Sequence, residues 1–286
     1  MMVLILNRHY FIVLLLFLSS CSNYGQLQIV ADLPNSLHEI SGIQTAKNSK
    51  LIWALNDGGN KNRIYGLSSK GKIKKVITIN AKNNDWEDLT SDHLGNLYIG
   101  DFGNNYSNRK NLAILKVDAN DLKNNKNTDV ERIRFFFPDQ KKFPPKKKQL
   151  YFDTESFFFH NDHLYLFTRS RVKGSYGKTS LYKIPAKEGN HAAKFISEFS
   201  FCKKLKCSIT SAAISSDKKK MVLLSHNTVI LFSDFYDDDF FSGKVIQLPL
   251  NHKSQKEGIC FKDDNTLYIT DERTHGKGGN LYVFKL

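Results

Sequence analysis

The chain repeats one pattern five times between residue 38 and its C-terminus. Each unit opens with a short segment of small and apolar residues, at 38–43 (HEISGI), 86–91 (WEDLTS), 154–159 (TESFFF), 210–215 (TSAAIS) and 256–261 (KEGICF). A second strand-like segment follows each of these, in order LIWALND, NLYIGD, HLYLFTR, MVLLSH and TLYITDE. A third follows in every unit, and a fourth in all but the last. Because the runs are rich in β-branched and aromatic residues and helical periodicity is almost absent, the chain is predicted to be all-β.

Four antiparallel strands repeated in this way predict a β-propeller. The last unit lacks a fourth strand because the chain ends at Leu286, and residues 27–33 (LQIVADL) are expected to supply it. This pairing would close the ring and remove an exposed sheet edge. Counting units favours five blades. Six is the alternative, because residues 118–150 form a long irregular segment that could hide another unit. A pair of β-sandwiches would not explain the repeat.

The N-terminal segment is typical of a secretory signal. Arg8 and His9 precede an apolar run at residues 11–18, which is too short to span a membrane and ends in small residues. The ending Leu18-Ser19-Ser20-Cys21 resembles the lipobox of bacterial lipoproteins, which implies cleavage before Cys21 and acylation (palmitate) of that cysteine. The expected division is a signal peptide at 1–20, a lipidated tether at 21–26 and one domain at 27–286. The alternative is an ordinary signal peptide or anchor helix with a chance cysteine.

The expected location is the bacterial cell envelope. The lipid would hold the protein at a membrane without spanning it. No acidic run follows Cys21, so the periplasmic face of the outer membrane is favoured over surface display.

The basic charge does not indicate a nucleic-acid partner. The formal net charge is +14, but the lysines gather in loop-like runs such as 146–148 and 218–220 without interleaved aromatic residues. We interpret these lysines as solvent-exposed surface residues. The protein is expected to be a monomer. Cys202 and Cys207 lie close together in FCKKLKC, where a disulfide and two free thiols are equally consistent with the sequence. Cys260, in an apolar run, is expected to be a small buried hydrophobic residue.

Propeller topology brings many acids to one end of the central channel. The start of the first strand and the end of the second strand of each blade lie on the same face. The first-strand starts contribute Glu39, Glu87, Glu155 and Glu257, with Thr210 in the fourth unit. The second-strand ends contribute Asn56, Asp57, Asp101, Arg169, His226, Asp271 and Glu272. Asp85, Asp88, Asp153, Asn104 and Asn105 lie beside them. The sequence therefore predicts a ring of carboxylates around one channel mouth.

Such a ring needs neutralising, because close like charges raise one another's pKa. A hard cation such as calcium would do this, since it binds carboxylate and carbonyl oxygens. The expected metal ligands are Asp57, Asp101, Glu155 and Asp271. Ligand binding is expected to involve these together with Glu39, Glu87, Arg169, Glu257 and Glu272. Internal ion pairs to Arg109, Arg169, Arg171 and Lys256 are one alternative, and glutamates bonded to backbone amides of the neighbouring blade are another.

Three further features concern the same mouth. Trp86 is either a stacking surface for a ligand or a wedge between blades, with the wedge slightly favoured. Segments 56–60 (NDGGN) and 101–105 (DFGNN) are predicted to be parallel loops of adjacent blades, and neither fits the calcium loop of an EF-hand. No GxSxG elbow, phosphate-binding glycine loop or HExxH zinc helix is present in the sequence.

The succession EISGI, LIWALNDGGN, DWEDLT, NLYIGDFGNN, DTESFF, LYLFTRSR, ITSAAIS, QKEGIC and LYITDE resembles a group of bacterial exported propeller proteins. These are related in pattern to the SdiA-regulated and esterase-like phytase propellers. The resemblance covers nearly the whole mature chain and implies a propeller with an acidic, calcium-binding channel mouth. It does not establish catalysis. Thr210 interrupts the glutamate series, and the phosphate-holding basic residues of a phytase are represented here by Arg109, Arg169, Arg171 and Lys256.

We expect an envelope protein that binds a ligand or partner at this acidic mouth. The competing class is a hydrolase, either a glycosidase with paired carboxylates or a calcium-assisted phosphoesterase. A purely structural role ranks third. Binding alone predicts that blade-to-blade bonds occupy most of the mouth carboxylates. Hydrolysis predicts a carboxylate with a raised pKa beside an open cleft.

Overall fold

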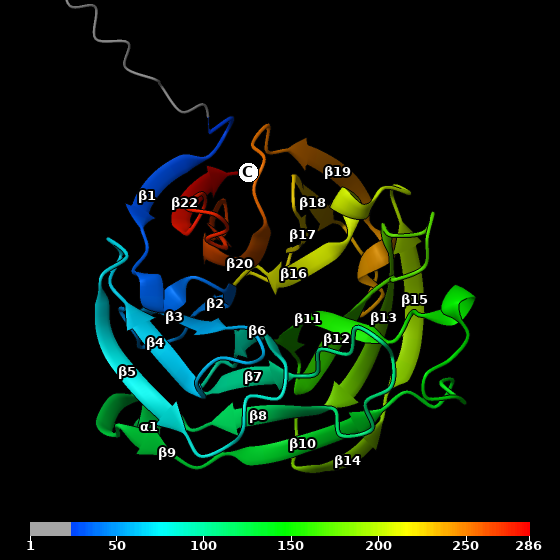
Figure 1. Cartoon of the computed structure of the whole chain (residues 1–286), viewed down its shortest axis with the longest axis horizontal. Helices are drawn as coiled ribbons and strands as arrows, with labels where there is room; N and C mark the ends of the chain where they lie inside the picture. The colour runs from blue at the N-terminus through cyan, green and yellow to red at the C-terminus, as the bar shows by residue number, and fades with distance from the viewer. Residues whose placement is uncertain (1–23) are drawn as a thin grey trace, which may run out of the picture.

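The computed structural model describes residues 24–286 as a five-bladed β-propeller, with its sheets arranged around a central channel (Figure 1). The first blade contains β2 (Ile40–Thr45), β3 (Ile52–Asn56), β4 (Arg63–Leu67) and β5 (Ile73–Ile79). The second contains β6 (Trp86–Ser91), β7 (Leu97–Asp101), β8 (Ala113–Val117) and β10 (Glu131–Phe136). The third contains β11 (Asp153–His160), β12 (His163–Arg169), β13 (Lys178–Pro185) and β15 (Lys194–Ser200). The fourth contains β16 (Ile209–Ile214), β17 (Lys220–Ser225), β18 (Thr228–Ser233) and β19 (Lys244–Pro249).

The fifth blade joins the two ends of the described chain. It contains β20 (Lys256–Asp263), β21 (Thr266–Asp271), β22 (Asn280–Lys285) and, as its outer strand, β1 (Gln28–Asp32). β1 pairs antiparallel with β22, from Gln28 opposite Val283 to Asp32 opposite Asn280. The predicted closure of the ring by the N-terminal strand is confirmed.

The irregular segment after residue 118 does not contain a sixth blade. It forms α1 (Ala119–Asn124) and then β9 (Asn127–Thr128), which pairs parallel with β5 of the first blade. The chain then enters β10, the fourth strand of the second blade, against which β14 (Gly189–Ala192) adds a parallel strand. The 3-10 turns are η1 (Asn35–Leu37), η2 (Lys147–Gln149), η3 (Leu205–Cys207) and η4 (Phe240–Ser242).

The hydrophobic core is divided among the interfaces between blades. β3 and β7 are buried on both faces, which explains their nearly continuous apolar sequences, whereas β5 alternates between buried and more exposed residues. One cluster of buried side chains lies between each pair of neighbouring blades. Trp86 has no exposed surface and packs with Trp53 between the first two blades, so the wedge interpretation is confirmed.

The cysteines of the described chain have distinct roles. Cys202 and Cys207 form a disulfide across the loop that precedes β16. Cys260 is fully buried, and burial raises the pKa of its thiol to about 12, which makes it unreactive. No helix in residues 24–286 has the length and apolar character needed to span a membrane. The signal segment and Cys21 lie outside the described residues.

Candidate functional site

A β-bulge interrupts the first strand of every blade at the acidic end of the channel. The last residue pairs before these bulges are equivalent in the five blades: Ile40–Asn56, Trp86–Asp101, Thr154–Thr168, Ile209–Ser225 and Lys256–Asp271. The residues inside the bulges are Ser41, Glu87 with Asp88, Glu155, Thr210 and Glu257. A bulged residue is unpaired and its side chain is re-aimed. The bulges therefore place three glutamates and two hydroxyl residues at equivalent points around the channel.

Glu39 does not belong to this series. It precedes Ile40, and since Ile40 corresponds in register to Trp86, Glu39 corresponds to Asp85 and not to Glu87. Its side chain is 49% exposed and accepts a 2.5 Å hydrogen bond from Asn60 at the rim. Matching the first two units by their glutamates was wrong, because Glu39 precedes the pair Ile40–Asn56, whereas Glu87 follows the equivalent pair Trp86–Asp101.

The second strands show a similar offset of one residue. Asp101 and Asp271 occupy the paired positions that end β7 and β21, whereas Asp57 and Glu272 come one residue later than the equivalent position. Because successive side chains of a strand point to opposite sides, this offset changes the direction of the carboxylate. Asp101 and Asp271 are both buried, with at most 1% of their surface exposed.

These two buried acids are occupied by internal bonds. Asp101 accepts hydrogen bonds from Asn84 at 2.6 Å and from Arg109 at 3.1 Å. Asp271 accepts from Tyr282 at 2.7 Å and lies 3.8 Å from the ammonium of the fully buried Lys256. The expected metal set of Asp57, Asp101, Glu155 and Asp271 is thus not brought together.

A different group of carboxylates converges at the mouth. Asp57, Asp85 and Glu87 each offer an oxygen, and all three oxygens lie within 4.8 Å of one another. Asp57 follows β3 of the first blade, while Asp85 and Glu87 flank the start of β6 in the second. We call these three residues the carboxylate triad. Sequence reasoning placed Asp57 and Glu87 in the site but put Asp85 only beside it.

Two glycines fit closely against the triad. A Cβ atom built on Gly58 would overlap the carboxylate of Asp85, and one on Gly103 would overlap those of both Glu87 and Asp85. These glycines belong to NDGGN and DFGNN, and the prediction that these are parallel loops of adjacent blades is confirmed, because the loops start at the equivalent positions Asn56 and Asp101. Only a residue without a side chain lets each loop approach the carboxylates this closely.

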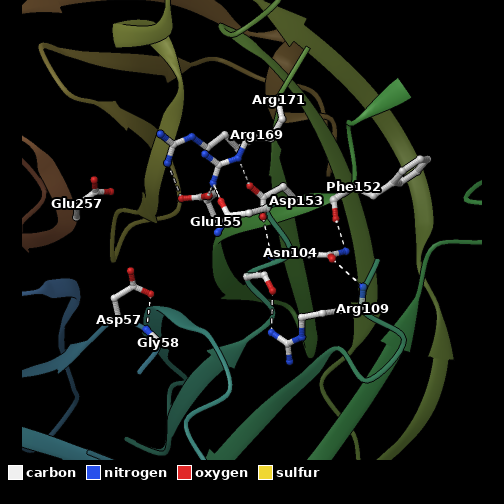
Figure 2. A network of polar contacts seen from close by, with 12 residues as sticks. Asp57, Gly58, Asn104, Arg109, Phe152, Asp153, Glu155, Arg169, Arg171 and Glu257 are labelled. Atoms are coloured by element: carbon white, nitrogen blue, oxygen red, sulfur yellow. Dashed lines mark hydrogen bonds and ion pairs between the residues drawn. The ribbon is translucent and has the colours of Figure 1, made fainter. Parts of the chain in front are cut away.

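Arginines neutralise the part of the mouth that belongs to the second and third blades (Figure 2). Arg169 lies 2.9 Å from Glu155, and Arg171 bridges Asp153 at 2.5 Å and Glu155 at 2.8 Å. Burial opposes the ionised form of Glu155, but Arg169 and then Arg171 outweigh it and lower the pKa of this carboxyl. The internal ion pairs weighed as an alternative to a metal therefore exist in this half.

Carboxyl groups still outnumber guanidinium groups at the mouth. The acids are Glu39, Asp57, Asp85, Glu87, Asp101, Asp153, Glu155, Glu257 and Glu272, and the arginines are Arg109, Arg169 and Arg171. Figure 2 shows Asp57 and Glu257 across the opening from the Arg169–Glu155 pair. Glu257 has a partner in His226, whose Nε2 lies 3.4 Å from the carboxylate. The described mouth thus carries a large excess of negative charge whenever its acids are ionised.

Burial and this excess of negative charge raise the pKa values of the carboxylate triad. Burial, followed by the charges of Asp85, Glu155 and Glu257, raises the pKa of Asp57 to about 7, although the Gly58 amide opposes this. Burial and neighbouring carboxylates also raise the pKa of Asp85 and, more strongly, that of Glu87. A carboxyl that holds its proton near neutral pH will exchange it for a cation that satisfies the same oxygens.

Two further acids have raised pKa values at the mouth. Burial, with the charge of Glu257 next in importance, raises the pKa of Glu272 to about 8. Glu272 also lines a cavity of about 820 Å³ together with Tyr24, His252 and Tyr282. Burial and Glu155 raise the pKa of Asp153 to about 8 despite its contact with Arg171.

Asp88 has the structural role that was considered for the glutamates, which is to form hydrogen bonds between blades. It has no exposed surface, and burial raises its pKa well above the ordinary value. It accepts hydrogen bonds from the Leu89 amide at 2.8 Å and from Ser211 of the fourth blade at 3.1 Å. The hydroxyls in the bulges act in the same way, since Ser41 and Thr210 donate to carbonyl oxygens of neighbouring first strands.

No protein-family model matches the chain, and no curated protein matches its sequence. Among solved structures, a gluconolactonase from Xanthomonas campestris is similar, with a TM-score of 0.50 and 11% identity over 91% of this chain and 89% of that one. A virginiamycin B lyase from Staphylococcus aureus aligns with a TM-score of 0.42 and 16% identity over 89% of this chain and 68% of that one. The gluconolactonase alignment supports the propeller fold and nothing finer.

Proposed function

We propose that this chain is an envelope lipoprotein whose propeller binds a divalent cation, with calcium favoured, at Asp57, Asp85 and Glu87. The loaded mouth then binds a small molecule, glycan or protein partner. The observation that carries the proposal is the convergence of three carboxylate oxygens within 4.8 Å, with no arginine or lysine paired to any of the three in the described residues.

The donor set fits a hard cation. All three groups of the carboxylate triad supply oxygen, and the close contacts of Gly58 and Gly103 hold these oxygens in place. Calcium takes six to eight oxygens in flexible geometry, which suits ligands that come from separate loops, whereas magnesium demands a nearly ideal octahedron. When bound, the cation would compensate the negative charge that the arginines leave unpaired. It would also keep coordination positions open for water or a ligand.

Thermal melting of residues 26–286 with calcium, magnesium or chelator tests the cation. At a hundred times its dissociation constant, calcium should stabilise the fold by about 2.7 kcal/mol, which corresponds to several degrees. Glu87→Gln should remove this shift. Asp234→Asn is the matched control, because Asp234 is an exposed acid that pairs with Lys244 away from the carboxylate triad. If calcium does not change the melting midpoint, the mouth carboxylates are neutralised by protons and arginines instead.

Hydrolysis is the second candidate, and one observation favours it. Glu272 has a pKa of about 8 and lines the 820 Å³ cavity beside the mouth, so it can hold a proton for a leaving group at neutral pH. This is the combination expected of a phosphoesterase or glycosidase. If chromogenic phosphoesters or glycosides are cleaved, Glu272→Gln should lower kcat by about a hundredfold or more. Equal turnover by wild type and variant would exclude this role for Glu272.

The membrane anchor is tested separately. Cells that express the full chain should incorporate a palmitate analogue into it, and Cys21→Ser should abolish labelling and release the protein from the membrane fraction. Protease protection in intact cells would support the periplasmic face. Labelling that persists in Cys21→Ser would contradict the assignment of this cysteine.

A further inference from the structure

The opposite end of the central channel contains a second cavity. The first strands end there, and residues from all five blades line its wall, among them Thr45, Ser91, Phe159, Ile214 and Phe261. The cavity has a volume of about 670 Å³, within the range of small-molecule sites. We call it the far mouth. The length of a first strand separates it from the carboxylate triad, so the two ends can bind different ligands.

Lys218 presents a cation to the far mouth without a partner. It lies in the turn between β16 and β17 with φ of 64°, a left-handed conformation uncommon for a residue with a side chain. Desolvation against the wall lowers the pKa of its ammonium, and no carboxylate opposes this. Within residues 24–286 its ammonium makes no hydrogen bond or ion pair. Lys218 remains accessible to solvent, so an anionic group from outside the chain can reach its partly desolvated ammonium and pair with it.

Most acids of the wall are already satisfied by their own turns. Both oxygens of Asp92 accept hydrogen bonds, at 2.7 to 3.1 Å, and Asp263 accepts one at 3.0 Å. Asp162, in the turn between β11 and β12, is different, because its carboxylate makes no hydrogen bond within the described chain. In the part of the chain that the structure describes, the ammonium of Lys47 on the same wall also has no hydrogen bond or ion pair, so the far mouth offers two unpaired cations, Lys47 and Lys218, and the unpaired carboxylate of Asp162.

Aromatic rings complete the wall. Phe159 and Phe261 line the cavity with 7% and 8% of their surfaces exposed. An apolar wall with a few converging polar groups suits a ligand that has both an apolar face and polar substituents. We propose that the far mouth binds an acidic saccharide, with Lys218 holding its carboxylate or phosphate, Asp162 accepting from its hydroxyls, and the two phenylalanines packing against the ring.

The test is calorimetric titration of metal-free residues 26–286 with glucuronate, glucose 6-phosphate, glucose and inorganic phosphate. The two acidic sugars should bind. Glucose and phosphate should each bind at least about tenfold more weakly, since each lacks one of the two recognised features. Lys218→Gln should weaken glucuronate binding by about tenfold or more, and Asp162→Asn should weaken it without affecting inorganic phosphate.

Lys219→Gln is the matched control, since Lys219 is the neighbouring exposed lysine and does not line the cavity. Equal affinity of Lys218→Gln and Lys219→Gln for glucuronate would overturn the proposal, as would binding of inorganic phosphate as tight as that of glucuronate. Glu87→Gln separates this proposal from the cation site, because it should abolish the calcium effect and leave glucuronate binding unchanged. Loss of glucuronate binding in Glu87→Gln would place the sugar at the acidic mouth and contradict the assignment to the far mouth.

Discussion

Replacing Arg171 with methionine tests the electrostatic account of the mouth in detail. Arg171 contacts Asp153 and Glu155, whose side chains are 0% and 4% exposed, and its own side chain is 27% exposed. Removing one partner of a buried ion pair costs about 3–5 kcal/mol, because the other charge remains buried. Arg169 still holds Glu155, and solvent reaches Arg171, so we expect a loss of about 2–3 kcal/mol at pH 8.

The loss should depend on pH with a definite sign. Without Arg171, the folded-state pKa of Asp153 rises further above its unfolded value, and the pKa of Glu155, which the two arginines lower, rises as well. A carboxyl raised in this way takes up a proton in the folded state, so its destabilising effect is small near pH 5 and grows as pH rises through the raised pKa. We therefore expect the difference between variant and wild type to shrink to less than about 1 kcal/mol at pH 5.

Urea unfolding of residues 26–286 at pH 5 and pH 8 measures both values. Lys244→Met is the matched control, because it breaks the Lys244–Asp234 pair, whose side chains are 78% and 64% exposed, and should change nothing measurable at either pH. If Arg171→Met destabilises the protein no more than the control at pH 8, or equally at both pH values, the reasoning about the arginine half of the mouth is refuted.

Four other predictions have definite expected outcomes. Trp86→Ala should lower the free energy of unfolding by about 3–5 kcal/mol, measured by urea titration, because it empties a fully buried site between blades. Gly103→Ala should reduce the rise in midpoint caused by calcium while leaving the metal-free melt cooperative, because its Cβ would displace Glu87. Metal-free protein should melt at a higher temperature at pH 5.5 than at pH 8.5, because Asp57 and Glu272, with pKa values of about 7 and 8, destabilise the fold as they ionise. Calcium affinity should rise about tenfold or more from pH 6 to pH 8, since Asp57, with a pKa of about 7, must release its proton over that range and the raised pKa values of Asp85 and Glu87 act in the same direction. A flat pH profile in either measurement would contradict these assignments.

The fold was predictable because a propeller repeats its hydrophobic pattern. Five units, a missing last strand and a spare N-terminal strand determine the ring and its closure, and the structure agrees. The bulky Trp86 could be assigned to the interface between blades for the same reason. These features depend on apolar runs several residues long, so an error of one residue in alignment does not change them.

The site was less predictable because it depends on single-residue register. Asp57 and Asp101 both end second strands in the sequence, yet one faces the mouth and the other is buried against Arg109. Asp85 was undervalued, since it precedes the strand that carries Glu87. The signal that could have found it is the pair of glycine loops, because Gly58 and Gly103 both contact Asp85. The ion pairs between acids and arginines were also unpredictable, because an arginine side chain is long and the spacing in the sequence does not show which carboxylate it reaches.

Direct calcium titration of wild type and Glu87→Gln by isothermal calorimetry tests the central claim most directly. The experiment uses metal-free residues 26–286 at pH 7.5 in two buffers of different ionisation enthalpy, so that proton release is measured together with binding. The account predicts one calcium site per chain in the wild type, with protons released as Asp57 gives up its hydrogen, and loss of that site in Glu87→Gln. Absence of calcium binding in the wild type, or unchanged binding in the variant, would contradict it.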